Sequence, residues 1–256
     1  MSFFETVVKI IEKYWKQLLL GMGNTLLIAL ISTLIGLLIG ILIGVIRTVP
    51  YSKNPIVRAF QKFVNFLLVC YIEIFRGTPM MVQAMVIYWG YAFATDGSTL
   101  PLLPSALFIV SINTGAYIAE IVRGGIISID KGQFEGAKSV GMNHWQTMVN
   151  VVIPQVIRNI LPAVGNEFVI NIKDTSVLNV IGVVELFYQS QIIGKATWQT
   201  FPVYAITCVL YFIMTFSITR ILRLIERLLD GKGNYTICGS QSDPNAQIKI
   251  RGEAHE

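Results

Sequence analysis

Residues 18–46 read LLLGMGNTLLIALISTLIGLLIGILIGVI, a run without any charged side chain. An α-helix rises about 1.5 Å per residue, so about 20 apolar residues cross the hydrocarbon core of a bilayer. The run exceeds that length and predicts a transmembrane helix. Because lipid offers backbone groups no hydrogen-bond partner, we expect the other membrane-crossing segments of this chain to be helical as well.

The composition extends this conclusion to the whole chain. Its 256 residues are 54% hydrophobic and only 14% charged, whereas a soluble domain is about 25% charged. Two further charge-free runs, Gly97–Ala119 and Ala196–Thr219, are also long enough to cross a bilayer. We therefore expect an all-α membrane protein with about five transmembrane helices.

Residues Ile56–Thr95 leave two topologies open. One helix over this range would be about 60 Å long, twice the thickness of the hydrocarbon core. We expect one long, tilted or broken span. The alternative is two spans hinged at Arg76-Gly77-Thr78-Pro79, which would place the acid-free link Arg47–Lys62 outside the cell.

The two ends of the chain differ from its middle. Residues 1–20 mix charged and apolar side chains at helical spacing, with Phe4, Val7, Val8, Ile11 and Trp15 on one face. This pattern predicts an N-terminal amphipathic helix lying at the membrane interface. Residues 231–256 are polar and rich in Gly, Ser, Gln and Asn, which predicts a disordered tail.

The lysine and arginine residues predict the orientation, because they are enriched in short cytoplasmic loops. The link Arg47–Lys62 and the polar stretch Arg123–Arg158 each hold four basic residues, and six more follow from Arg220 onward. With all three regions in the cytoplasm, the C-terminus lies inside and the N-terminus outside.

A glycine-punctuated polar segment interrupts the apolar chain at about residues 130–154. It holds Glu135-Gly136-Ala137, then Gly141 after three residues, and Val151-Val152-Ile153-Pro154 after nine more. Small side chains at 136 and 137 allow a partner's backbone to approach closely, Gly141 permits a turn, and Pro154 suits the first turn of a helix. Glu135 would present its charge to the partner or cap its own helix.

The spacing E-G-A-x3-G-x9-V-x-I-P resembles the signature loop of bacterial ATP-binding cassette (ABC) importer permeases, usually E-A-A-x3-G-x9-I-x-L-P. Other motifs resemble the polar amino-acid branch of these permeases, which includes uptake systems for glutamine, histidine, arginine and cystine. They are RGTP at 76–79, NTGAYIAE at 113–120, RGGI at 123–126, SIDKGQ at 128–133 and IKDTS at 172–176. The resemblance covers residues 21–230.

The resemblance implies a type I ABC importer transmembrane fold in the bacterial cytoplasmic membrane. Residues 130–154 would form a coupling helix that sits in a groove of a separate ATPase. The implied partners are two ATPase subunits, a second permease that is identical or paralogous, an extracellular or periplasmic binding protein and a polar amino acid. ATP and Mg would be bound by the ATPase, and neither a cofactor of this chain nor a nucleic-acid partner is expected.

The chain itself lacks a nucleotide-binding motif, so we expect no enzymatic activity. Its nearest approach is Gly132-x3-Gly136-Ala137-Lys138-Ser139, whereas a phosphate-binding loop needs Gly-x4-Gly-Lys-Ser/Thr after a buried strand. The three cysteines are scattered and indicate neither a disulfide framework nor a metal site.

Polar residues inside predicted spans are candidates for substrate contact. Thr78 lies where Gly77 and Pro79 should break a helix, and transporters commonly bind substrates at such breaks. Glu167 would offer a carboxylate to an amino or cationic group, and Asn113 an amide. For the pairs Glu73–Arg76 and Glu120–Arg123 we favour ion pairs that hold the helices together.

Two other classes of membrane protein are alternatives to an importer permease. A gradient-driven secondary amino-acid transporter would use intramembrane carboxylates, but it predicts inverted repeats that the chain does not show. A membrane scaffold or sensor would have no use for an ATPase-coupling helix.

Overall fold

The computed structural model describes residues 2–229, and its regular structure there is entirely helical. The elements are α1 (Phe3–Ile46), α2 (Pro55–Gly77), α3 (Met80–Ala94), α4 (Leu102–Ile127), α5 (Lys131–Ser139), α6 (His144–Thr147), the π-helix η1 (Met148–Val152), α7 (Ile153–Asp174), the 3-10 helix η2 (Thr175–Ile181), α8 (Leu186–Thr197) and α9 (Thr200–Leu229). The predicted disordered tail, residues 231–256, lies outside the described residues.

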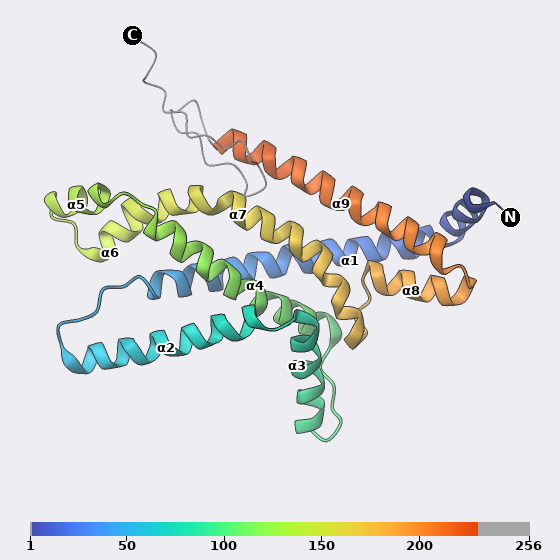
Figure 1. The fold of residues 1–256 in the computed structure, drawn as a ribbon, viewed down its shortest axis with the longest axis horizontal. Helices are drawn as coiled ribbons and strands as arrows, with labels where there is room; N and C mark the ends of the chain where they lie inside the picture. The colour runs from blue at the N-terminus through green and yellow to red at the C-terminus, as the bar shows by residue number, and fades with distance from the viewer. Residues whose placement is uncertain (1, 230–256) are drawn as a thin grey trace, which may run out of the picture.

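Five helical segments of the described part are long and apolar enough to cross a membrane. They are α1, α2, α4, the continuous stretch His144–Ile181 that contains α7, and α9. The expected all-α membrane protein with about five spans is therefore confirmed. Figure 1 shows α5 and α6 at one end of the bundle, with the start of α1 and α8 at the other.

A stripe of three glycines brings α1 close to α4. Gly36, Gly40 and Gly44 recur every fourth residue and therefore share one face of α1. A Cβ atom on Gly40 would lie 2.5 Å from the Ile118 side chain and 2.9 Å from the backbone nitrogen of Ala119. Small residues at such spacing let membrane helices pack backbone against backbone, because there is no side chain to hold them apart.

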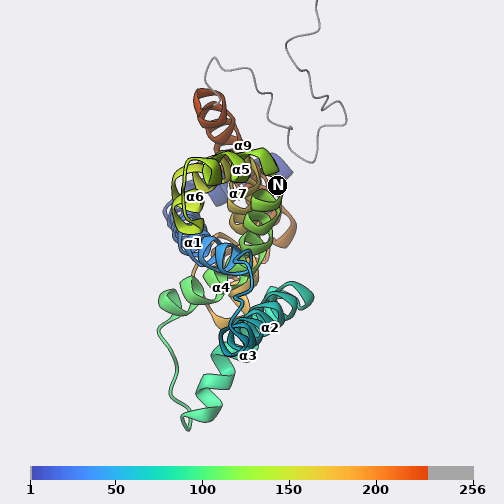
Figure 2. The same cartoon turned by 90° about the vertical axis from the view of Figure 1, so that its left-hand side faces the viewer.

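The region Ile56–Thr95 forms two helices rather than one. Thr78 has the extended backbone that a following proline imposes, so α2 ends at Gly77 and α3 begins at Met80. Only α2 is long enough to span; α3 is a shorter apolar helix that turns away from the α2 axis (Figure 1) and projects from the side of the bundle (Figure 2). Of the two topologies, the geometry matches a single span that is broken at Pro79.

The described part of the N-terminal segment, from Phe3 to residue 20, is continuous with the first span. Helix α1 is a single element that starts with a capping box between Ser2 and Glu5. Its 44 residues make about 66 Å of helix, so part of it must extend beyond the hydrocarbon core. The apolar side chains of Phe4 and Val8 are exposed. Their placement at the membrane interface remains a prediction.

Candidate functional site: a coupling element and a broken helix

Residues 130–147 form a compact helical element at one end of the bundle. Asp130 caps α5 by accepting a hydrogen bond from the Gly132 backbone nitrogen, and a capping box between Asn143 and Gln146 starts α6. The turn between the two helices passes through Gly141, whose φ of +80° strains any residue with a side chain. The predicted turn at Gly141 is therefore present, and Asp130 rather than Glu135 caps the helix.

The element has an inner and an outer face. Ala137 is buried, and Phe134 packs against the apolar cluster formed by the ends of α4 and α7. Glu135 is exposed and forms no hydrogen bond or ion pair within residues 2–229. A Cβ atom on Gly136 would meet nothing within 4 Å. The interpretation of small residues as a point of close approach therefore fits Gly136, whereas Ala137 faces the chain's own core.

Pro154 shapes the connection from this element into the span. It lies in the first turn of α7, as the sequence predicts, two residues after the last residue of the π-helix η1, Val152. Proline has no amide hydrogen, and its ring clashes with the carbonyl group four residues earlier. The wider π-helical turn accommodates this interruption, so the helical path from α6 into α7 stays continuous.

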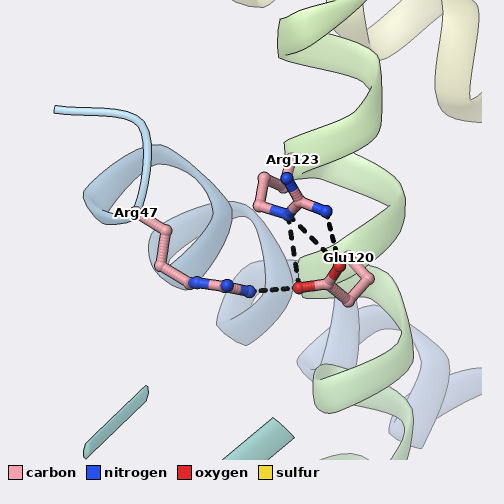
Figure 3. Close-up of polar contacts among 3 residues, drawn as sticks. All are labelled: Arg47, Glu120 and Arg123. Carbon is pink, nitrogen blue, oxygen red and sulfur yellow. Dashed lines mark hydrogen bonds and ion pairs between the residues drawn. The ribbon is translucent and has the colours of Figure 1, made fainter. Parts of the chain in front are cut away.

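An ion triad ties the same end of the bundle together (Figure 3). The Glu120 carboxylate on α4 accepts hydrogen bonds from Arg47 Nη1 at the end of α1 and from Arg123 Nη2, the latter at 3.0 Å. The Glu120–Arg123 ion pair expected from the sequence is confirmed, and Arg47 is an additional partner. The expected Glu73–Arg76 pair is wrong, because the described residues contain no such ion pair and Arg76 lies over the Tyr117 ring at 5.4 Å.

The side chain of Gln83 links α3 to the end of α2 across the break between them, and the sequence analysis did not predict this contact. Gln83 Nε2 lies 2.9 Å from the carbonyl oxygens of Phe75 and Thr78 and 2.8 Å from Thr78 Oγ1. These carbonyl groups belong to the last turn of α2, where intrahelical partners are missing. Thr78 itself is exposed, and its hydroxyl group also donates to the Ile74 carbonyl oxygen at 2.8 Å.

Asn113 joins this network from α4. Its Nδ2 donates to Gln83 Oε1 at 2.9 Å, and both side chains are buried. The structure thus brings two of the three predicted substrate residues, Thr78 and Asn113, to the same glutamine. A lone glutamine within the apolar helix Met80–Ala94 was the available sequence signal for this position.

Glu167 stands apart from that network. It is partly buried on α7, within electrostatic range of Asp174 and Arg76, and none of the hydrogen bonds of the described residues links it to Thr78 or Asn113. Its neighbour on the same face, Asn171, instead holds helices together. Asn171 Nδ2 donates to Thr33 Oγ1 at 2.8 Å and Thr114 Oγ1 at 3.0 Å.

No group of three or more His, Cys, Asp or Glu side chains that could hold a metal ion occurs within residues 2–229.

A multi-pass helical bundle with a broken helix and an exposed helical element at one end is compatible with a membrane permease. The family described as "Binding-protein-dependent transport system inner membrane component" matches residues 36–231, and this chain belongs to that family. It is thus a transport subunit of an ABC importer rather than an enzyme, and it works with a binding protein and a separate ATPase. This membership favours the importer over the secondary transporter and the scaffold.

Several curated proteins are similar to this chain. The glutamine transport system permease protein GlnP of Escherichia coli K12 is 39% identical over 163 residues, which cover 64% of this chain and 74% of GlnP. The L-cystine transport system permease protein TcyB of Bacillus subtilis 168 is 39% identical over 161 residues, covering 62% and 68%. The putative glutamine permease GlnP of Rickettsia typhi is 30% identical over 221 residues, covering 86% and 98%.

Solved structures confirm the predicted importer fold. The crystal structure of an amino acid ABC transporter with histidines matches with a TM-score of 0.73 and 36% sequence identity, covering 89% of this chain and 99% of that one. The inward-facing MetNI methionine ABC transporter matches with a TM-score of 0.69, covering 85% and 98%. Its 20% identity supports likeness of fold alone.

Proposed function

We propose that this permease imports a polar amino acid and that the α5–α6 element receives the motion of the ATPase. The observation that carries the coupling role is the two-sided character of this element. Its inner residue Ala137 is buried, whereas Glu135 and Val140 on the outside are exposed and Gly136 has open space around it. A partner can therefore approach the outer face without disturbing the fold of this chain.

The packing supports a mechanical path from this element into the bundle. Phe134 of α5 shares one apolar cluster with Val122 of α4 and Val156 of α7, while the Arg47–Glu120 pair ties α1 to α4. Close-packed protein interiors move as units rather than deform continuously. A displacement of α5 by the ATPase would tilt α4 and α7 together and expose the substrate site to alternate sides of the membrane.

The cargo proposal rests on the relatives and on the polar groups at the broken helix. The curated relatives are named for glutamine and cystine transport, and the 36% identical structure is an amino acid transporter. Thr78, held in place by Gln83 and Asn113 behind it, offers its hydroxyl oxygen as an acceptor to a polar substrate. Glu167 would pair with the α-amino group or another cation of the substrate.

The proposed assembly has two permease subunits, identical or paralogous, and two ATPase subunits that bind ATP and Mg. The α5–α6 element and the C-terminus would face the cytoplasm, with the N-terminus outside. The basic residues near α5 and at the α1–α2 link support this orientation.

Position 136 offers a sharp test in the assembled importer. Gly136→Trp would leave this chain folded, because the site is open, but it would block the partner and abolish substrate-stimulated ATP hydrolysis. Gly136→Ala is the matched control: it restores the usual residue of the signature loop and should keep full stimulation. Normal stimulation in the tryptophan variant would refute the coupling role, and uptake that persists without ATP would refute the importer mechanism.

A further inference from the structure

A half-enclosed pocket of about 210 Å³ lies at the corner between the end of α1 and the start of α2. Its walls include the apolar side chains of Tyr51, Phe60 and Val64, and its polar groups come from Arg47, Gln61 and Asn65. The pocket is remote in sequence from the broken helix at Thr78 and separate from the outer face of α5. Neither of the roles proposed above uses it.

The polar side chains that line the pocket differ in how many hydrogen bonds they form with the rest of the chain. Gln61 is engaged with the link, because its Oε1 accepts from the Ser52 backbone nitrogen at 2.8 Å. Arg47 Nη1 donates a hydrogen bond to Glu120, but Arg47 Nε is buried and has no hydrogen-bond partner among residues 2–229. Within the same residues, the Asn65 amide also has no hydrogen-bond partner. Asn65 is half-buried and the Arg47 side chain keeps 14% of its surface exposed, so N–H groups of both can donate to a ligand with acceptor oxygens.

The charge around the pocket identifies the sign of that ligand. The triad holds two arginines and one carboxylate, which leaves one positive charge in excess. Lys53, Arg58 and Lys62 are exposed nearby, and residues 47–62 contain no acidic side chain. Each basic residue near an anionic membrane surface contributes about 1 kcal/mol of attraction.

The position of the pocket identifies the source of the ligand. It lies where one candidate membrane-spanning helix ends and the next begins, and we infer from this that it lies at the level of the lipid headgroups. The apolar wall continues along α2 as the exposed aromatic side chains of Phe60, Phe63 and Phe66. A headgroup bound in the pocket would therefore have its acyl chains beside an apolar helix surface.

We propose that this pocket binds the headgroup of an anionic phospholipid. The phosphate oxygens accept hydrogen bonds from the accessible N–H groups of the Arg47 guanidinium and from the Asn65 amide, and the surrounding basic residues attract the charge. The glycerol region packs on Tyr51 and Phe60, and the acyl chains lie along α2. Since Arg47 also holds Glu120, the lipid contacts the triad that joins α1 to α4.

The test is native mass spectrometry of the purified importer in a neutral detergent, titrated with phosphatidylglycerol or with phosphatidylcholine of the same chain lengths. The wild-type complex should retain phosphatidylglycerol about tenfold more tightly. Arg47→Lys keeps a charge for Glu120 but removes the other guanidinium donors, and should weaken retention about tenfold. Val64→Trp fills the pocket and should abolish the preference for phosphatidylglycerol.

Two matched variants control for general effects on charge and surface. Arg123→Lys alters the arginine on the other side of Glu120, and Val209→Trp makes the same change as Val64→Trp at an exposed position on α9. Both should bind phosphatidylglycerol as the wild type does. Equal retention of the two lipids, equal losses in test and control variants, or displacement of the lipid by soluble glycerol phosphate would each overturn the proposal.

Discussion

Replacing Gln83 by methionine should weaken transport while leaving the importer assembled. Methionine has a similar length and keeps the apolar contacts of α3, but it removes every hydrogen bond made by the glutamine amide. Those bonds are the donations to Phe75 and Thr78 and the acceptance from Asn113, all between 2.8 and 2.9 Å. The last turn of α2 would then lose the side chain that fixes the position of Thr78.

The size of the effect follows from which groups lose a partner. The carbonyl group of Thr78 lies at an exposed break and can bind water instead, so its loss costs little. The buried Asn113 amide keeps only a 3.3 Å contact to the Phe75 carbonyl oxygen. One poorly satisfied buried group costs about 1–2 kcal/mol, which corresponds to a loss of about 5- to 30-fold in the population of the binding geometry.

The assay is ATP-driven uptake of the cognate amino acid into proteoliposomes, measured over a range of substrate concentrations. We expect half-saturation at a concentration about tenfold higher, with the ATPase still bound to the complex. Gln17→Met is the matched control, because that glutamine is exposed on α1 and far from the break in sequence. Unchanged uptake by the Gln83 variant would refute the role of this network in substrate binding.

Two further predictions concern the stability of the bundle, measured by thermal unfolding of the purified permease in detergent. Gly40→Ala should destabilise the bundle by about 1–2 kcal/mol, because overpacking at the α1–α4 contact outweighs the gain of about 1 kcal/mol in helix propensity. The control is Gly23→Ala: a Cβ atom at position 23 would lie in open space, so this change should be neutral or stabilising. Glu120→Gln should cost about 3 kcal/mol, because it leaves the largely buried Arg47 without its carboxylate partner. Arg123→Gln should cost less, since that side chain is 37% exposed, and equal effects of the two changes would contradict the assignment of Arg47 as the main partner.

Local features of the sequence predicted the parts of the structure that depend on short segments. Charge-free runs located spans, and Thr78-Pro79 indicated a break because proline restricts the residue before it. Gly141 and Pro154 indicated the turn and the start of α7 for similar reasons. Each of these conclusions rests on a few neighbouring residues, so no knowledge of the packing was needed.

The missed contacts join residues that are far apart in the chain. Gln83 meets Asn113 across 30 positions, and Arg47 meets Glu120 across 73, so neither partner was visible from helical spacing. Ala137 lies in a helix of only nine residues, too short for its apolar pattern to show which face turns inward. The direction of α3 depends on its packing against α4 and η2, which the sequence at the break does not encode.

The central claim is that the outer face of α5–α6 contacts the ATPase. The most direct measurement places a photo-crosslinking amino acid at Val140, which is 72% exposed beside the coupling turn, in the assembled importer. The same amino acid at Phe201, which is 74% exposed at the start of α9, is the control. We expect a crosslink to the ATPase from position 140 and none from position 201. A crosslink from position 201, or none from position 140, would contradict this claim.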